Sequence, residues 1–350
     1  MSIGLIVKNC DNFFSAGINQ QSIYTYNLLK SMGYNIEIYC ENVSSQYLNV
    51  GTKSEKYTLK KIEDIHSTKH DIVMCISNNI NTDTYNILKS NNTKVIYFVC
   101  GNYLYLIHEC YLYNIHTEMI QLMENTNFDE IWTFSMYNYM KDFLSVLYKK
   151  PVKTMPYVWD NTILKTSNNK IECNKSESVG GPVNIVITEP NFSIHKSSFI
   201  PLLICEDILD EYPNIINKIF LICGDNVNKD VVMRFKNINT KIEFYPRFQT
   251  YLLLESLNKL EEQCIFLSHN INNDQNFIMH ELVSCGWKLV HNAPYFSNYG
   301  YYYNTTENAY DIKGGSSVLK TAIDSQYKLD KRVEQLDKKV INDMRVLLKV

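Results

Sequence analysis

The chain has 350 residues, which at roughly 150 residues per domain predicts about two domains. Apolar residues make up 45% and charged residues 20%, a composition that excludes a disordered or fibrous protein. The formal net charge of -3 supplies no long-range positive field, so nucleic acid and anionic lipid are not expected partners.

The ten cysteines lie mostly within apolar runs and form no CxxC pair. They therefore indicate neither a zinc site nor a disulfide framework, and they favour a reducing, cytoplasmic location. No apolar run approaches the roughly 18 residues of a membrane span, and we expect no transmembrane segment. The short apolar run 3–7 is expected to be a first strand rather than a signal peptide.

Apolar runs alternate with amphipathic segments through the first half of the chain. This order predicts a parallel sheet, and strands that are apolar on consecutive residues are typical of a sheet covered on both faces. The expected strands are 3–7, 35–40, 71–77, 94–100, 130–134 and 152–155, and the expected helices are 20–32, 82–90, 104–124 and one beginning near Ser135.

Composition changes after residue 160, and the Asn-, Ser-, Lys- and Gly-rich segment 161–182 is interpreted as a linker. The alternation then restarts, with strands expected at 183–188, 218–223, 241–245, 264–268 and 288–291. The intervening helices are expected at 198–212, 230–236, 251–262, a segment ending near Cys285, 316–326 and 331–348.

The sequence therefore predicts an α/β fold of two Rossmann-like domains with a ligand cleft between them. The N-terminal domain is expected to span 1–160 and the C-terminal domain 183–329. Residues 330–350 are expected to form a C-terminal helix able to pack back on the first domain.

Ligands of such folds bind at the carboxyl ends of the strands. The loop after the first strand carries Gly17, Asn19 and Gln20, and it leads into a helix whose N-terminus attracts anions. The corresponding loop of the second half carries Lys196, where a lysine can neutralise a diphosphate. A solvated surface lysine remains the alternative.

A third candidate region precedes the strand 288–291. A helix starting near Gln275 would direct the backbone N–H groups of Asn276 and Phe277 at an anion. Glu281 interrupts an otherwise apolar helix and needs partners, for which ribose hydroxyls are suitable and a salt bridge is the alternative. In the first half, His108 and Glu109 flank a strand end.

Together these features resemble the GT-B glycosyltransferases, in particular a group related to the retaining glycogen-synthase-like superfamily. The resemblance rests on the glycine loop, on the segments 129–135 and 156–160, on the loop 189–196 and on the His280-Glu281 helix that ends in Ser284-Cys285-Gly286. It implies transfer of a sugar from a UDP- or GDP-linked donor to a glycan, lipid or protein acceptor, with retention of configuration and with no metal or other cofactor.

The resemblance also implies roles for individual residues. Lys196 would contact the donor diphosphate, Glu281 the ribose, the amides of Asn276 and Phe277 the phosphate, and His108 the transferred sugar. His280 belongs to the same donor-binding helix, while Gly17, Asn19, Gln20 and Glu109 would face the acceptor or the cleft.

Two positions depart from the family pattern. Asn273 stands where a first glutamate is usual, so Asp274 beside it is the candidate substitute. The usual arginine before the phosphate lysine is missing, and Arg247 is the candidate second cation. A non-catalytic nucleotide- or sugar-binding protein and a nucleotide-sugar epimerase therefore remain alternatives. A dehydrogenase is disfavoured because the first strand is not followed by GxGxxG.

Overall fold

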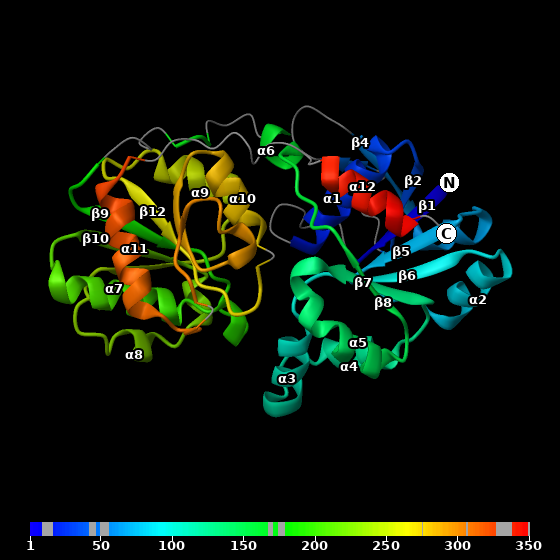
Figure 1. Cartoon of the computed structure of the whole chain (residues 1–350), viewed down its shortest axis with the longest axis horizontal. Coiled ribbons are helices and arrows are strands. Elements are labelled where there is room, and N and C mark those ends of the chain that lie inside the picture. Colours follow the sequence, from blue (N-terminus) through cyan, green and yellow to red (C-terminus); the bar gives the residue numbers. More distant parts are fainter. Residues whose placement is uncertain are drawn as a thin grey trace. The chain divides into compact units, whose positions relative to one another are not determined.

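The computed structural model describes residues 1–8, 17–41, 47–49, 56–166, 171–173, 179–274, 276–305, 307–326 and 338–348. The chain divides into two compact units (Figure 1). The first unit comprises Met1–Asn168 and Gln335–Val350, and the second comprises Asn169–Glu334.

The first unit is built on a sheet in the order β3-β4-β2-β1-β5-β6-β7-β8. All neighbouring strands are parallel except β3, which is antiparallel to β4. The strands are β1 (Ser2–Val7), β2 (Asn35–Cys40), β3 (Tyr47–Asn49), β4 (Lys56–Lys61), β5 (Ile72–Ile76), β6 (Lys94–Val99), β7 (Glu130–Phe134) and β8 (Val152–Met155).

Helices connect these strands and complete the first unit. They are α1 (Gly17–Ser31), α2 (Thr82–Ser90), α3 (Tyr103–Tyr113), α4 (Glu118–Glu124), α5 (Lys141–Tyr148), α6 (Thr162–Thr166) and α12 (Lys338–Leu348), with the short 3-10 helices η1 (Ile62–Ser67) and η2 (Ser135–Met140). The last helix, α12, packs against β8. In the chain, Lys338 at the start of α12 follows Met155 at the end of β8 by 183 positions.

The second unit has its own parallel sheet in the order β11-β10-β9-β12-β13-β14. Its strands are β9 (Val183–Ile187), β10 (Ile216–Ile222), β11 (Ile242–Tyr245), β12 (Cys264–Leu267), β13 (Lys288–His291) and β14 (Tyr301–Tyr302). Its helices are α7 (Phe199–Glu211), α8 (Lys229–Val232), α9 (Thr250–Leu257), α10 (Phe277–Ser284) and α11 (Ile312–Asp324), with the 3-10 helices η3 (Ile194–Lys196), η4 (Gly224–Asn226) and η5 (Pro294–Phe296).

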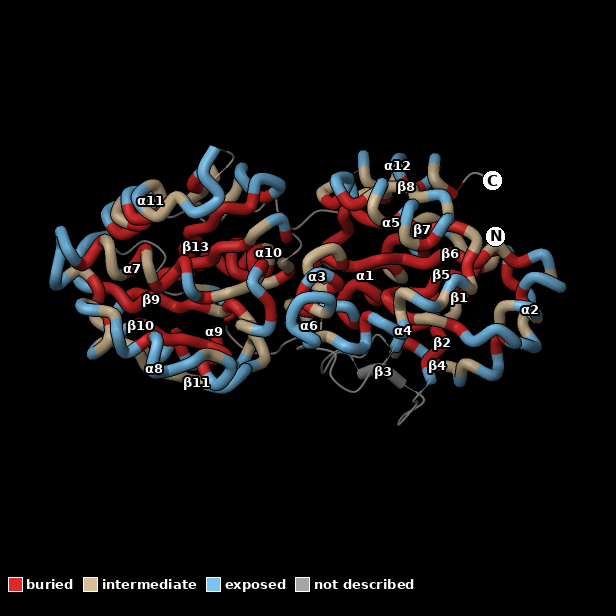
Figure 2. The backbone as a smooth tube through the Cα atoms, turned by 90° about the horizontal axis from the view of Figure 1, so that it is seen from below, coloured by how far each residue is buried: buried red, intermediate tan, exposed pale blue. Residues whose placement is uncertain are grey.

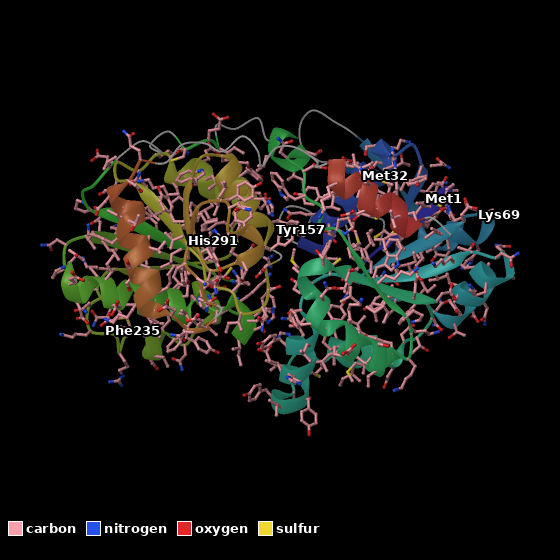
Figure 3. All side chains as sticks on the ribbon, viewed as in Figure 1. Met1, Met32, Lys69, Tyr157, Phe235 and His291 are labelled. Atoms are coloured by element: carbon pink, nitrogen blue, oxygen red, sulfur yellow. The ribbon has the colours of Figure 1, made fainter. Side chains whose placement is uncertain are left out.

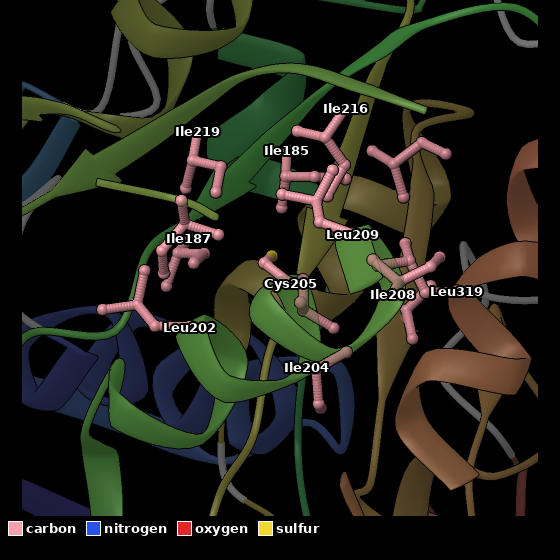
Figure 4. Packing of buried hydrophobic residues seen from close by; sticks show 14 of the residues in the cluster. Ile185, Ile187, Leu202, Ile204, Cys205, Ile208, Leu209, Ile216, Ile219 and Leu319 are labelled. Carbon is pink, nitrogen blue, oxygen red and sulfur yellow. The ribbon is translucent and has the colours of Figure 1, made fainter. Parts of the chain in front are cut away.

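Buried residues run along the central strands of both sheets (Figure 2). Every residue of β5, β7, β9, β12 and β13 is buried, because helices cover both faces of a parallel sheet. In the second unit, β9 and β10 pack against α7 and α11 through Ile185, Ile204, Ile219 and Leu319, which are 0% exposed (Figure 4). This core fixes the carboxyl ends of the strands, where the loops with the candidate residues begin.

The predicted α/β fold of two Rossmann-like domains is confirmed. The expectation of one long helix over 104–124 is wrong, because α3 ends at Tyr113, is capped by Asn114, and α4 starts only at Glu118. Asn114 and His116 both have a φ of 55°, a left-handed conformation that a helix cannot continue through. The strands β3, β4 and β14 were not expected from the sequence.

Candidate functional site

The loop between β9 and α7 has a fixed shape that is set by Asn191. Its backbone has a φ of 55°, and its Nδ2 donates to the carbonyl oxygen of Glu189 at 2.9 Å. Its Oδ1 accepts from the backbone N–H of Ser198 at 2.7 Å, and its own N–H donates to the carbonyl of Lys196 at 3.1 Å. One asparagine thus folds the chain back so that Glu189 and Lys196 belong to the same turn.

Lys196 and Arg247 supply positive charge to this site from two different loops. Lys196 ends η3 and is half-buried, and Arg247 is exposed in the loop that follows β11. Burial lowers the pKa of Lys196, the charge of Arg247 lowers it further, and the negative charge of Glu189 opposes both effects. Lys196 and Arg247, which come from separate segments of the sequence, therefore lie close enough in the structure for the charge of one to act on the other.

Glu189 is a buried acid beside these cations. Its side chain is 1% exposed, and the hydroxyl of Ser268, which follows β12, donates to its Oε1. Its Oε2 has no hydrogen-bond partner among the described residues. Burial raises the pKa of Glu189 to about 7, against the opposing effects of Ser268, Lys196 and the backbone of His269.

The loop between β12 and α10 is joined to the same turn. The N–H of Ile271 donates to the carbonyl of His195 at 3.1 Å, and Nδ2 of Asn270 donates to Ser268 Oγ at 3.0 Å. Burial lowers the pKa of His269 to about 4, although a hydrogen bond with the backbone of Ala309 raises it in part. His269 is therefore a neutral member of the cluster at physiological pH.

Three donor-site candidates lie in this loop and at the start of α10. Asn276 precedes the helix, and its N–H donates to the carbonyl of Asp274 at 3.0 Å, so this amide is engaged within the loop. Asp274 accepts from the N–H of Tyr295 at 3.1 Å, and burial raises its pKa despite that bond. Phe277 is buried at the first position of α10. Gln275, where the helix was expected to start, lies outside the described residues.

The remaining donor-site candidates lie further along α10. Glu281 is 2% exposed, so this carboxylate is inside the second unit as its position in an apolar helix predicts. The ring of His280 contacts Phe296 at a centroid distance of 4.6 Å. His291, which ends β13 (Figure 3), has its ring 5.4 Å from the same phenylalanine ring. Burial, aided by His291, lowers the pKa of His280 to about 3, which keeps its imidazole neutral.

The candidates of the first unit are Gly17, Asn19 and Gln20 on α1 and two residues of α3. Gly17 is exposed at the start of α1, whereas Asn19 and Gln20 are buried in its first turn. The preceding residues 9–16 lie outside the described part of the chain.

On α3, neighbouring candidate residues have opposite surroundings. His108 is exposed, whereas Glu109 is 3% exposed and its Oε2 lies 3.2 Å from Nε2 of His116. Consecutive side chains on a helix point about 100° apart, so His108 and Glu109 do not share a face.

The described residues contain no group of three or more His, Cys, Asp or Glu side chains able to hold a metal ion. Within the same ranges, no helix is long and apolar enough to cross a membrane.

Glu189, Ser268 and His269 were not expected as site residues. The sequence places Glu189 directly after a buried strand and seven residues before Lys196, which is a signal that could have been used. Its burial depends on Ser268, which lies 79 residues further along the chain, and no local pattern contains that contact.

Solved structures with the same overall fold are glycosyltransferases. The chain is similar over 99% of its length to 99% of an alpha-glucosyltransferase solved with UDP-glucose and DNA containing an abasic site, with a TM-score of 0.56 and 11% identity. It is similar over 99% to 95% of the alpha,alpha-trehalose 6-phosphate synthase of Burkholderia multivorans, with a TM-score of 0.53 and 11% identity. The pneumococcal O-GlcNAc transferase GtfA, solved with UDP and GlcNAc, gives a TM-score of 0.52 at 8% identity, covering 99% of this chain and 98% of that one.

At these identities the likeness establishes the fold, which is the two-domain GT-B fold of glycosyltransferases. No curated protein sequence matches the chain. The model of one family does match, over residues 1–347. The chain therefore belongs to the family DUF2827, which is described as a protein of unknown function.

Proposed function

We propose that this protein is a glycosyltransferase that binds a UDP- or GDP-linked sugar in its second unit and transfers the sugar to a glycan, lipid or protein acceptor. The observation that carries the proposal is the convergence of Lys196 and Arg247 at the carboxyl ends of the β9 and β11 strands. In a doubly wound sheet this edge is where ligands bind.

The chemistry follows from the charges. Departure of a nucleoside diphosphate places negative charge on its phosphate oxygens, and cations already held in position stabilise that charge as it develops. Lys196 and Arg247 would do this without a metal ion. Glu281 would accept hydrogen bonds from the donor ribose, while Asp274, Phe277 and His280 would shape the remaining donor site.

We further propose that transfer proceeds with retention of configuration and that His108 contacts the transferred sugar. Gly17, Asn19, Gln20 and Glu109 would bind the acceptor or line the donor cleft. These assignments are supported by the family resemblance. Asn19, Gln20 and Glu109 are polar side chains buried in the first unit.

The test begins with thermal unfolding in the presence of UDP, GDP, UDP-glucose and GDP-mannose. A ligand at about 100 times its Kd is expected to stabilise the protein by about 2.7 kcal/mol. The Lys196→Ala variant is expected to bind the same nucleotide roughly 10- to 100-fold more weakly, because a charge-assisted contact contributes about 1.5 to 3 kcal/mol.

Lys236→Ala is the matched control, since Lys236 is an exposed lysine of the same unit. Release of nucleoside diphosphate from the sugar donor, lost in Lys196→Ala and kept in Lys236→Ala, would support the transferase. Binding without release would favour a non-catalytic sugar- or nucleotide-binding protein. Conversion of the donor sugar without an acceptor would favour an epimerase, and stabilisation by none of the four ligands would contradict the proposal.

A further inference from the structure

Glu189 is a buried acid that takes no part in the donor contacts proposed above. The carboxyl is enclosed at the end of β9, with Ser268 bonded to Oε1 and no hydrogen-bond partner for Oε2 among the described residues. A buried charge is costly unless it is paired. Lys196, in the same turn, is the cation whose charge acts on Glu189.

Three titratable groups around this pair, His269, Tyr303 and Cys223, keep one charge state near neutral pH. The pKa of His269 is about 4, and burial raises the pKa values of Tyr303 and Cys223. Arg247 is a second cation whose charge acts on Lys196. His195 lies in the same turn, with Nδ1 2.5 Å from Ser193 Oγ.

Glu189 and Lys196 are the two oppositely charged groups of this turn whose ionised forms burial disfavours. Burial has moved their pKa values toward each other, that of Glu189 to about 7 and that of Lys196 downward from its ordinary value. Without a ligand, the negative Glu189 balances the positive Lys196. A bound diphosphate would bring further negative charge against the same lysine.

We propose that Glu189 is the resident counter-ion of Lys196 and takes up a proton when the phosphates of a nucleotide sugar bind at Lys196 and Arg247. This inference rests on the proposed function, because it assumes that these cations hold the phosphates. Like charges at short distance disfavour the ionised form of an acid, so the bound anion favours protonated Glu189. The proton comes from solvent and returns there when the nucleotide leaves.

The sign of the pH dependence follows directly. The bound state holds Glu189 protonated to a higher pH than the free state does. Affinity is therefore greatest below about pH 7 and falls as pH rises through the pKa of the free state, by up to about tenfold per pH unit. Deprotonation of Lys196 would act in the same direction, so the experiment must separate the two groups.

The decisive variant is Lys196→Arg, because arginine keeps the positive charge at every pH used. Calorimetry would measure the binding of UDP-glucose and GDP-mannose to Lys196→Arg and to the double variant Lys196→Arg/Glu189→Gln, in buffers of different ionisation enthalpy. The phosphates of these two ligands do not titrate near neutrality. Glutamine keeps the acceptor for Ser268 and the shape of the side chain, and any contribution of His195 is common to both variants.

For Lys196→Arg we expect roughly tenfold weaker binding at pH 8 than at pH 6 and uptake of close to one proton per nucleotide at pH 8. For the double variant we expect a change of less than about twofold and almost no proton uptake. If the double variant does not fold, the same comparison between the natural protein and the single variant Glu189→Gln decides the question, because both keep Lys196 and His195.

The possible failures are distinguishable. Tight binding to Lys196→Arg with pH-independent affinity and no proton uptake would overturn the role of Glu189 and leave the proposed function intact. Equal proton uptake in the two variants would assign the proton to another group and also overturn it. If neither sugar nucleotide binds the natural protein, the proposed function fails and this inference fails with it.

Discussion

Lys288 shows how a single buried cation can hold two elements of the second unit together. It is 1% exposed in β13, and its Nζ donates to the carbonyl oxygens of Ala322 at 2.9 Å and Ser325 at 2.6 Å and to Gln263 Oε1 at 3.3 Å. The two carbonyls lie at the end of α11, where they have no partner within the helix. Lys288 therefore joins this helix end to strand β13 of the sheet.

The same burial makes the stability of the second unit depend on pH. Burial lowers the pKa of Lys288 from its ordinary value of 10.5 to about 8, while Cys173 and Asp324 oppose the shift. Between these values the unfolded chain binds more protons than the folded one, so stability rises with pH. Relative to Lys288→Met, the natural protein should gain up to about 3 kcal/mol between pH 8 and pH 10.5.

Urea unfolding followed by the fluorescence of Trp287 measures this gain. Trp287 is buried in the second unit and donates from Nε1 to the carbonyl of Ile171. Trp132 and Trp159 should be changed to Phe so that one probe remains. The exposed Lys236→Met is the control, and an equal pH dependence in Lys288→Met and natural protein would contradict the assignment.

At the scale of elements, α7 and α11 approach each other closely because Gly315 has no side chain. A Cβ added at Gly315 would lie 2.5 Å from Cδ1 and 2.9 Å from Cγ1 of Ile204. Ile204 is 0% exposed in the core, so its side chain has little room to move.

Gly315→Ala is therefore expected to destabilise the second unit by about 1 to 3 kcal/mol, although alanine is the better helix former. Ser317→Ala is the matched control, because Ser317 is exposed two residues further along α11. Urea midpoints of the two variants provide the comparison. A Gly315→Ala protein as stable as Ser317→Ala would show that the helices separate without cost.

The elements that could be predicted from the sequence are those with strong local patterns. The segments 72–76, 95–99 and 264–267 are runs of consecutive apolar residues, and the structure has the strands β5, β6 and β12 there. The break at Asn114 was missed because the apolar side chains of α3 and α4 continue across it. Asparagine often adopts the left-handed conformation that ends a helix, so Asn114 itself is a sequence signal for the break.

The site residues likewise fall into those with a signal in the local sequence and those without one. Lys196 could be predicted because it lies in the loop that follows an expected strand, where ligands of this fold bind. Glu281 could be predicted because it is a charged residue in an otherwise apolar helix, and it is buried in the structure. Glu189 was missed because a carboxylate in a loop is usually solvated. Only the fold reveals that Ser268 and Lys196 enclose it.

At the scale of the whole molecule, the chain leaves the first unit and later returns to it. Residues Gln335–Val350 belong to the first unit, and within α12 Met344 is 0% and Leu348 3% exposed. Helix α12 packs against β8 with this buried side. The stability of the first unit therefore depends on residues that follow the second one.

Met344→Ala is expected to destabilise the first unit by about 2 to 5 kcal/mol, because it removes a buried side chain and leaves a cavity. Val346→Ala is the control, since Val346 is 68% exposed in the same helix. The fluorescence of Trp132 should report the loss when Trp159 and Trp287 are replaced by Phe. A loss reported by Trp287 instead would contradict the placement of α12.

The return of α12 to β8 also constrains the order in which the protein can fold during synthesis. A ribosome completes the second unit, Asn169–Glu334, before it makes the helix that covers β8. Until then, the first unit exposes the apolar surface that Met344 and Leu348 later cover. The second unit can therefore reach its final fold first, and the nascent first unit is the part that needs protection from aggregation.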